Sequence, residues 1–291
     1  MANNPLLEDK LSRFHVMLKK SGICEETLDF FKDVIWTHYR KHGRKFSFRN
    51  TKDPYRILIS EVMLQQTQAE RVEKKFDEFI KEFPGFESLA LAPVEEILKL
   101  WSGLGYNRRA LALKTIAERV VADFQGTLPN SVKDLESFPY IGPNTAGSIS
   151  AFAFNLPVVF IETNIRRVFI QFFFHEQGEV NDDDIRPLVE QTLDKDNPRE
   201  WYFALIDYGV MLKKKYKNAN KKSAHYRKQS KFKGSNRELR GKVLKHLLKA
   251  PASMEDIKNV SKSDGQKVKV VLAQLKKEGF IEKIGERYKL K

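Results

Sequence analysis

Residues 138–169 read FPYIGPNTAGSISAFAFNLPVVFIETNIRRVF, and this stretch decides the fold that we predict. It opens with a tight turn over residues 138–142, between a short helix expected over 131–137 and a small-residue helix expected over 143–154. A glycine that ends the turn and a proline at the first helical position are typical of this geometry. Such a turn directs backbone N–H groups and a helix N-terminus at one point, where a phosphate can bind.

The second half of the stretch carries an acid. An apolar extended run over residues 158–161 leads to Glu162, Thr163 and Asn164, at the start of a helix expected over 165–174. The stretch therefore predicts either a DNA-binding turn with a carboxylate close to it in sequence, or an ordinary helical hairpin followed by an acid that caps a helix.

Composition sets the limits of the interpretation. The 291 residues are enough for roughly two domains, and the hydrophobic content of 41% is ordinary for a globular protein. No apolar run approaches a membrane span, and the first residues lack the pattern of a secretory signal. The single cysteine, Cys24, cannot form an internal disulfide or a multi-cysteine metal centre, which fits a reducing cytoplasm.

The charge is strongly basic and locally concentrated. The net charge is +14, and residues 213–233 contain ten Lys or Arg, beginning with Lys213, Lys214 and Lys215, but no Asp or Glu. Three aromatic residues lie among these cations. The segment is either a solvated linker or a phosphate-binding segment, and its uncompensated charge favours phosphate contact.

The first two-thirds of the chain is expected to be all-helical, because no alternating strand pattern appears before residue 235. Asp53 and Pro54 predict the start of a helix that carries Glu61 among apolar neighbours. Such surroundings favour the acid form of a carboxyl group, although an ordinary helix-surface acid fits the pattern too.

A polar corner follows this helix. Gln65 and Gln66 lie between two helices, where they could fill the space left by an extruded base or form a solvated turn. Thr67 and Glu70 predict a capping box for the next helix.

The last sixty residues have a different pattern. Helices are expected over 237–248, 254–260 and 264–278, followed by a hairpin that pairs 280–284 with 287–290. Three helices and a β-hairpin of this size are typical of a winged helix. The third helix is the candidate for a DNA groove, and the alternative is a small protein-docking module. Its lysines, on or near it, are Lys262, Lys267, Lys269, Lys276 and Lys277.

Three motifs carry a resemblance to a known family. SEVMLQQTQ at 60–68, LWSGLGY at 100–106 and GPNTAG at 142–147 resemble the MutY-type adenine DNA glycosylases, members of the helix-hairpin-helix glycosylase superfamily. The resemblance spans roughly residues 30–212 and implies a mainly α fold, with a DNA-binding cleft between two helical subdomains. The expected division is an inserted helical barrel at 53–155, a second subdomain formed by 1–52 and 156–233, and the winged-helix-like domain at 234–291.

The resemblance also implies residue roles. Cleaving the N-glycosidic bond of a flipped base needs a proton donor and a negative charge near the sugar, the work that two carboxylates do in glycoside hydrolysis. Glu61 matches the acid position, Glu162 matches the catalytic aspartate, and Asn164 would help to hold it. DNA contacts are expected from Arg44, Gln65, Gln66, Tyr140, Gly142, Asn144, Thr145, Lys213, Lys214 and Lys215.

The sequence departs from the family pattern at several points. Glu162 stands where the family has aspartate, and Tyr140 stands at the usual first glycine of the hairpin. Asn144 replaces the lysine of strand-cleaving relatives such as endonuclease III, and an asparagine cannot form a Schiff base. The iron–sulfur cysteines are missing, so we expect no cofactor. The residues after 234 are too few for the Nudix-like domain that recognises 8-oxoguanine in the family.

The function predicted from the sequence is monofunctional DNA glycosylase activity in base excision repair, on adenine opposite guanine or 8-oxoguanine. One alternative is excision of another mispaired base, such as thymine opposite guanine, and another is a catalytically inactive DNA-binding protein. The expected partner is duplex DNA with a mismatch or lesion. We expect a cytoplasmic, nucleoid-associated monomer that contacts no membrane.

Overall fold

The structure is a computed structural model that describes residues 5–216, 218–228 and 231–291. It confirms the mainly α fold with a small sheet near its C-terminus. The chain divides into two compact units. One comprises Met1–Phe46, Ser131–Lys133 and Gly142–Lys228, and the other comprises Ser47–Asn130, Asp134–Ile141 and Gln229–Lys291.

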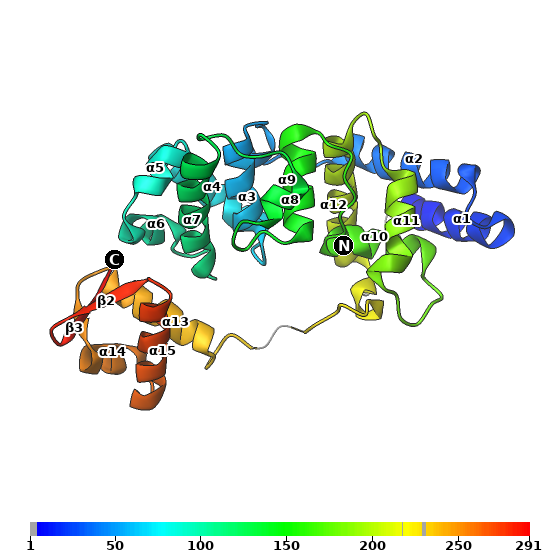
Figure 1. Cartoon of the computed structure of the whole chain (residues 1–291). Helices are drawn as coiled ribbons and strands as arrows, with labels where there is room; N and C mark the ends of the chain where they lie inside the picture. The colour runs from blue at the N-terminus through cyan, green and yellow to red at the C-terminus, as the bar shows by residue number, and fades with distance from the viewer. Residues whose placement is uncertain (1–4, 217, 229–230) are drawn as a thin grey trace. The chain divides into compact units, whose positions relative to one another are not determined.

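The first unit joins helices from both ends of its sequence. The first two helices, α1 and α2, pack with α10 and α12, which follow more than a hundred residues later (Figure 1). Phe14 and Phe31 each meet Phe172 edge to face at 5.0 Å between ring centroids, and they lie 6.2 Å from each other in its core. Its elements are α1 (Pro5–Ser21), α2 (Glu25–His42), α9 (Pro143–Phe154), α10 (Thr163–Phe173), α11 (Asp182–Thr192), α12 (Pro198–Lys215) and the 3-10 turn η2 (Ala219–Lys222).

The second unit begins with the helices that surround α3. Asp53 caps α3 by accepting the Tyr55 N–H at 2.9 Å, and Pro54 is its first residue, as predicted. Tyr55 in turn donates to the carbonyl of Phe83 at 2.6 Å. The elements of this part are η1 (Ser47–Arg49), α3 (Pro54–Leu64), α4 (Ala69–Glu82), α5 (Phe86–Leu91), α6 (Val94–Trp101) and α7 (Arg108–Asp123). A short helix, α8 (Val132–Glu136), precedes the turn at Tyr140.

The predicted capping box at the start of α4 is wrong. The N-cap is Gln68, and its side chain makes no capping hydrogen bond. Thr67 instead donates to the carbonyl of Leu104 at 3.3 Å and accepts from Arg109 at 3.1 Å. A distant arginine therefore takes the hydroxyl group that the local pattern assigned to the helix.

The second unit ends with a domain of three helices and a three-stranded antiparallel sheet in the order β1-β3-β2. The predicted hairpin is present, with Ile281 opposite Leu290 and Ile284 opposite Arg287. The sequence did not predict β1, which has only two residues. The elements are α13 (Asn236–Leu247), β1 (Ala252–Ser253), α14 (Met254–Ser261), α15 (Gly265–Lys277), β2 (Ile281–Ile284) and β3 (Arg287–Leu290).

This C-terminal domain contacts the start of α7 within the same unit. Glu278 accepts from Arg108 at 2.6 and 3.0 Å, and it also binds Arg240. Arg237 donates to the hydroxyl of Tyr106 at 2.5 Å and lies over its ring. The glycine-rich turn before α7 therefore has direct contacts with the winged-helix-like domain.

Candidate active site and nucleic-acid interface

Glu162 is the N-cap of α10. Its Oε1 accepts the backbone N–H groups of Asn164 and Ile165 at 2.7 and 2.9 Å, and its Oε2 accepts the Asn164 side-chain amide at 3.2 Å. Burial raises the pKa of this carboxyl group above its ordinary value, while the two backbone hydrogen bonds and the nearby Arg167 oppose the rise. The carboxylate is thus held in one place by donors that favour its charged form.

A second layer of contacts holds Asn164. Arg167 is buried, and it donates to the Asn164 side-chain oxygen at 2.7 Å and to the carbonyl of Gly209 at 3.0 Å. Helix α12 approaches so closely here that a Cβ on Gly209 would lie 2.4 Å from the Asn164 carbonyl oxygen. The glycine is required for α10 and α12 to pack at this distance.

The residues on both sides of Glu162 are held by side chains from other elements. Asn144, in the first turn of α9, accepts the Ile161 N–H at 3.0 Å. Asn220, in η2, is buried and donates to the carbonyl of Thr163 at 2.9 Å. Asn144 therefore has a structural contact beside Glu162, in addition to the DNA contact that the sequence predicts for it.

Part of the basic segment is ordered rather than a solvated linker. Val180 exchanges backbone hydrogen bonds with Lys222 and Ala224, at 2.8 and 3.0 Å. Lys213, Lys214 and Lys215 are exposed in the last turn of α12. The segment thus anchors the start of α10 through Asn220, and its first three lysines are exposed to solvent.

Glu61 lies in the last turn of α3, in the second unit. It is half-buried, and its neighbours Ser60, Val62 and Met63 are buried. The polar corner follows at once, with Gln66 exposed and in the left-handed backbone conformation at φ 56°. Gln65 donates from its side-chain amide to the carbonyl of Tyr140 at 3.0 Å. The structure therefore brings the glutamine corner and the tyrosine of the hairpin turn together.

Tyr140 adopts the conformation that a glycine usually supplies. Its φ is 64°, in the left-handed region, and its side chain is 49% exposed. Gly142 is extended and forms the N-cap of α9, with Pro143 as the first helical residue. The turn is thus formed despite the missing glycine, and the first turn of α9 places Asn144 and Thr145 next to its N-terminus.

Arg44 has a protein partner. Its side chain donates to the buried Asp207 at 2.7 Å, and its backbone N–H donates to the other oxygen of the same carboxylate at 2.7 Å. This ion pair holds the loop after α2 against α12.

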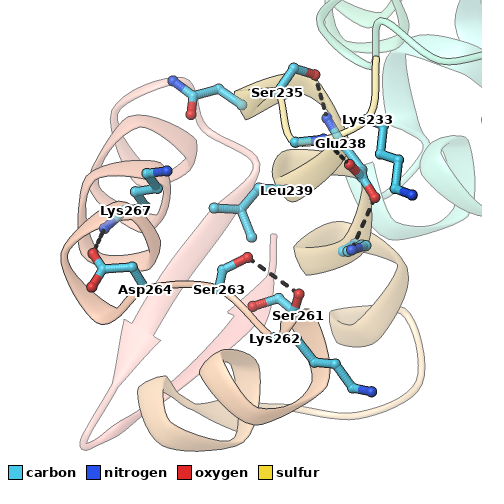
Figure 2. Close-up of a pocket in the computed structure, with 12 residues that line it drawn as sticks. Lys233, Ser235, Glu238, Leu239, Ser261, Lys262, Ser263, Asp264 and Lys267 are labelled. Carbon is cyan, nitrogen blue, oxygen red and sulfur yellow. Dashed lines mark hydrogen bonds and ion pairs between the residues drawn. The ribbon is translucent and has the colours of Figure 1, made fainter. Parts of the chain in front are cut away.

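A pocket of about 370 Å³ lies in the C-terminal domain. Figure 2 shows Leu239 in the middle of its lining, with Asp264 and Lys267 on one side and Lys233 and Glu238 on the other. Both carboxylates already have partners, since Asp264 caps α15 and Glu238 forms an ion pair with Lys242 at 3.0 Å. In the part of the chain that the structure describes, Lys233, Lys262 and Lys267 form no ion pair, so this surface has excess positive charge.

The described side chains offer no ligand set for an iron–sulfur cluster. One cysteine, Cys24 before α2, cannot supply a four-cysteine iron–sulfur ligand set. Among the described residues, no group of three or more His, Cys, Asp or Glu side chains is placed to hold a metal ion. None of the described helices combines the length and apolarity needed to cross a bilayer.

Comparison with known proteins agrees with this geometry. Residues 59–191 match the model of the HhH-GPD superfamily of base excision DNA repair proteins. An adenine DNA glycosylase of Buchnera aphidicola subsp. Baizongia pistaciae is 37% identical over 64% of this chain and 53% of its own length. A thymine/uracil-DNA glycosylase of Methanothermobacter thermautotrophicus is 30% identical over 62% of this chain and 84% of its own.

Solved structures show the same fold. A thermostable thymine-DNA glycosylase has a TM-score of 0.60 and 28% identity, and covers 67% of this chain and 91% of its own. Endonuclease III in a non-covalent DNA complex has a TM-score of 0.56 at 16% identity, covering 64% of this chain and 86% of its own.

The mainly helical fold, the helix-capping carboxylate and the hairpin define a helix-hairpin-helix protein of the DNA glycosylase class. The chain belongs to the HhH-GPD superfamily of base excision DNA repair proteins. It spans about half the length of the adenine DNA glycosylases that it matches.

The sequence did not single out three residues that support the predicted site residues, two in the first unit and one in the second. Arg167 donates to the Asn164 side chain, Asn220 donates to the Thr163 carbonyl, and Arg109 donates to the Gln65 carbonyl. Their signal in the sequence is weak, because an arginine or asparagine looks the same whether it faces solvent or the interior.

Proposed function

We propose that this protein is a monofunctional DNA glycosylase that hydrolyses the N-glycosidic bond of a mispaired base, with adenine opposite guanine or 8-oxoguanine as its substrate. The observation that carries the proposal is Glu162, a carboxylate fixed by three hydrogen bonds at the N-terminus of α10. It stands in a chain that shares its superfamily and 37% identity over 192 residues with an adenine DNA glycosylase.

In this reaction the base is first extruded from the duplex, at a cost of a few kcal/mol. Gln65 and Gln66 fill the space that it leaves. Glu61 then protonates the leaving base as the C1′–N bond breaks and the bond electrons pass to the base. The Glu162 carboxylate stabilises the positive charge that develops on the sugar. Water adds to C1′ and its released proton restores the acid, so the products are the free base and an abasic site.

Asn144 supports a monofunctional reaction. An amide side chain cannot form the Schiff base through which a lysine begins strand cleavage. In this chain Asn144 also accepts the N–H of Ile161, immediately before the catalytic glutamate.

The DNA-binding surface proposed here includes the turn at Tyr140 and Gly142, the first turn of α9 with Asn144 and Thr145, and the exposed lysines in the last turn of α12. We propose that the C-terminal domain adds a second contact through the excess lysines around its pocket, since unpaired cations bind phosphate without regard to sequence. A monomer is sufficient for this arrangement.

The experiment uses labelled duplexes with single A·G, A·8-oxoguanine, T·G and U·G pairs, incubated with the protein and then treated with hot alkali. We expect alkali-dependent cleavage at adenine. Cleavage at thymine or uracil would instead select the second candidate, which the 84% coverage of a thymine/uracil-DNA glycosylase favours. Binding without cleavage on every duplex would contradict an enzyme, and cleavage without alkali would contradict the monofunctional reaction.

A further inference from the structure

Arg109, in the first turn of α7, is buried and has no acidic partner among its hydrogen-bond acceptors. Only 3% of it is exposed, and its guanidinium lies 5.3 Å from the ring centroid of Trp101. Burial lowers the pKa of Arg109 to about 10, so the side chain still carries its charge at neutral pH. A buried charge is normally paired, because isolating it from water is costly. The hydrogen-bond acceptors around Arg109 must therefore offset the cost of burying its charge.

Those acceptors are gathered from the two turns on either side of it. One terminal nitrogen donates to the carbonyls of Val62, Met63 and Gln65 at 2.8, 2.9 and 2.6 Å. The other contacts the Thr67 hydroxyl and the carbonyls of Leu104 and Gly105 at 3.1, 3.2 and 2.9 Å. The planar guanidinium thus joins the end of α3, the glutamine corner and the glycine-rich turn before α7.

The first set of contacts closes the C-terminus of α3. A helix leaves its last four carbonyls without partners inside the helix. Here Arg109 satisfies those of Val62 and Met63, and the Thr67 N–H satisfies that of Leu64 at 3.1 Å. The chain then turns sharply through Gln66, whose φ of 56° is unfavourable for a residue other than glycine. A fixed charge that binds the carbonyl just before this residue stabilises the turn.

We propose that Arg109 is a positioning residue that sets the glutamine corner in the conformation needed to extrude a base. This inference rests on the proposed function, because it assigns Arg109 a role in the same reaction. Arg109 does not touch DNA; it acts through the backbone of Gln65 and the turn at Gln66. Lysine cannot replace it, since an ammonium group has three donors around one atom and cannot span acceptors from both turns.

The test is a double-mutant cycle on the single-turnover excision rate. Arg109→Lys should slow excision by roughly 10²-fold, the scale expected when a contacting group is displaced by about 1 Å, while affinity for an undamaged duplex stays within about threefold. In a Gln65→Ala/Gln66→Ala background the same substitution should cost about threefold or less, because the side chains it positions are gone. Equal losses in both backgrounds would overturn the proposal.

Two further variants separate positioning from folding. Arg199→Lys is the matched control, since Arg199 is also buried and also donates to a carbonyl near a helix C-terminus, that of Phe152; its excision rate should stay close to that of the wild type. Thr67→Val removes one acceptor of Arg109 with little change of shape, and should slow excision less than Arg109→Lys. If Arg109→Lys does not fold, an unchanged rate in Thr67→Val overturns the proposal.

A readout that needs no excision makes the two hypotheses distinguishable. Duplexes carrying 2-aminopurine at the target position report unstacking of that base by increased fluorescence. We expect the increase with wild type and its loss with Arg109→Lys. If wild type unstacks the base but releases none from any duplex, the proposed function fails and the positioning role stands. If Arg109→Lys unstacks the base as wild type does, the positioning role fails.

Discussion

Glu61 and Glu162 occupy opposite ends of their helices. Glu61 lies in the last turn of α3, where carbonyl oxygens give the helix end a negative partial charge, and Glu162 lies before the first turn of α10, where N–H groups face it. The negative end of α3 repels a carboxylate, whereas the N–H groups at the start of α10 attract one.

In each position a second effect opposes the helix end. Arg109 adds a cation at the end of α3, and burial raises the pKa of Glu162 against its hydrogen bonds. The comparison teaches that the helix end is only one influence on a carboxyl group: at Glu162 burial outweighs the N–H groups of the helix end, and the pKa is raised.

The largest expected effect is that of Glu61→Gln. Glutamine keeps the shape but has no acidic proton, so the excision rate should fall by about 10²–10⁴-fold, the contribution of general acid catalysis. Affinity for the mismatch duplex should remain. Single-turnover kinetics measures the first and a gel shift the second. Glu70→Gln, at an exposed position of α4, is the matched control and should excise at the wild-type rate.

Glu162→Gln should cost roughly 10²-fold in the excision rate, because it keeps an oxygen for the N–H groups of α10 but loses the negative charge. Glu162→Asp keeps both the charge and a capping oxygen, and should therefore be faster than Glu162→Gln. The same kinetic assay ranks the two variants. A glutamine variant faster than the aspartate variant would show that charge is not what this position supplies.

Gly209→Ala tests the close approach of α10 and α12 that holds Asn164. The new Cβ would meet the Asn164 carbonyl oxygen at 2.4 Å, so we expect a loss of about 1–3 kcal/mol in the free energy of unfolding. Gly241→Ala in α13 is the control, because a Cβ there meets nothing within 4 Å; it should add about 0.5–1 kcal/mol. Chemical denaturation measures both, and similar changes would mean that the approach is not tight.

The raised pKa of Glu162 predicts a pH dependence of stability. The neutral form is favoured in the folded state, so the contribution of Glu162 is complete below the ordinary glutamate pKa of 4.5 and is lost as the pH rises through the folded value. Glu162→Gln does not titrate, and should gain stability relative to wild type between pH 4 and pH 7. Melting temperatures measured across this range check the sign.

Glu238 provides the opposite case for the same measurement. A hydrogen bond from the Gly234 N–H, together with Lys242, lowers its pKa, so its contribution is present above the ordinary value and lost as the pH falls. Glu238→Gln should therefore lose stability relative to wild type as the pH rises from 4 to 7. If the stabilities of both variants relative to wild type changed in the same direction with pH, one of the two pKa shifts would be wrong.

The smallest expected effect concerns the lysines beside the N-terminus of α15. Each phosphate contact contributes about 0.9 to the slope of log affinity against log salt concentration. The triple variant Lys233→Gln, Lys262→Gln and Lys267→Gln should reduce that slope by up to about 2.7 on undamaged duplex DNA. Lys283→Gln, on the β2–β3 hairpin and paired with Glu286, is the control and should leave the slope unchanged.

The sequence predicted best those features that depend on neighbours along the chain. Helix α9 begins at Pro143 and ends at Phe154 as expected, and Asp53 caps α3. The prediction of a capping box at Thr67 failed because the hydroxyl binds Arg109, forty-two residues away. No local pattern shows that the Arg109 side chain turns inward. Strand β1 was missed for a related reason, since two residues become a strand only when Arg287 and Tyr288 lie beside them.

In the candidate site, too, the local features could be predicted and the contacts between distant residues could not. The roles proposed for Glu61 and Glu162 come from motifs, and the capping geometry of Glu162 follows from its place before a helix. The contacts of Arg167 with Gly209, of Asn220 with Thr163 and of Gly209 with Asn164 could not be predicted, because each joins residues that lie more than forty positions apart in the sequence.

The turn η2 has a consequence for how the protein is made. Asn220 ties this segment to the start of α10, and Val180 ties it to the chain just before α11, with hydrogen bonds from the chain itself. These bonds are made by the chain itself, so the segment reaches its place during folding. Synthesis in an iron-starved cell should therefore yield protein with the same DNA affinity as synthesis in an iron-rich one.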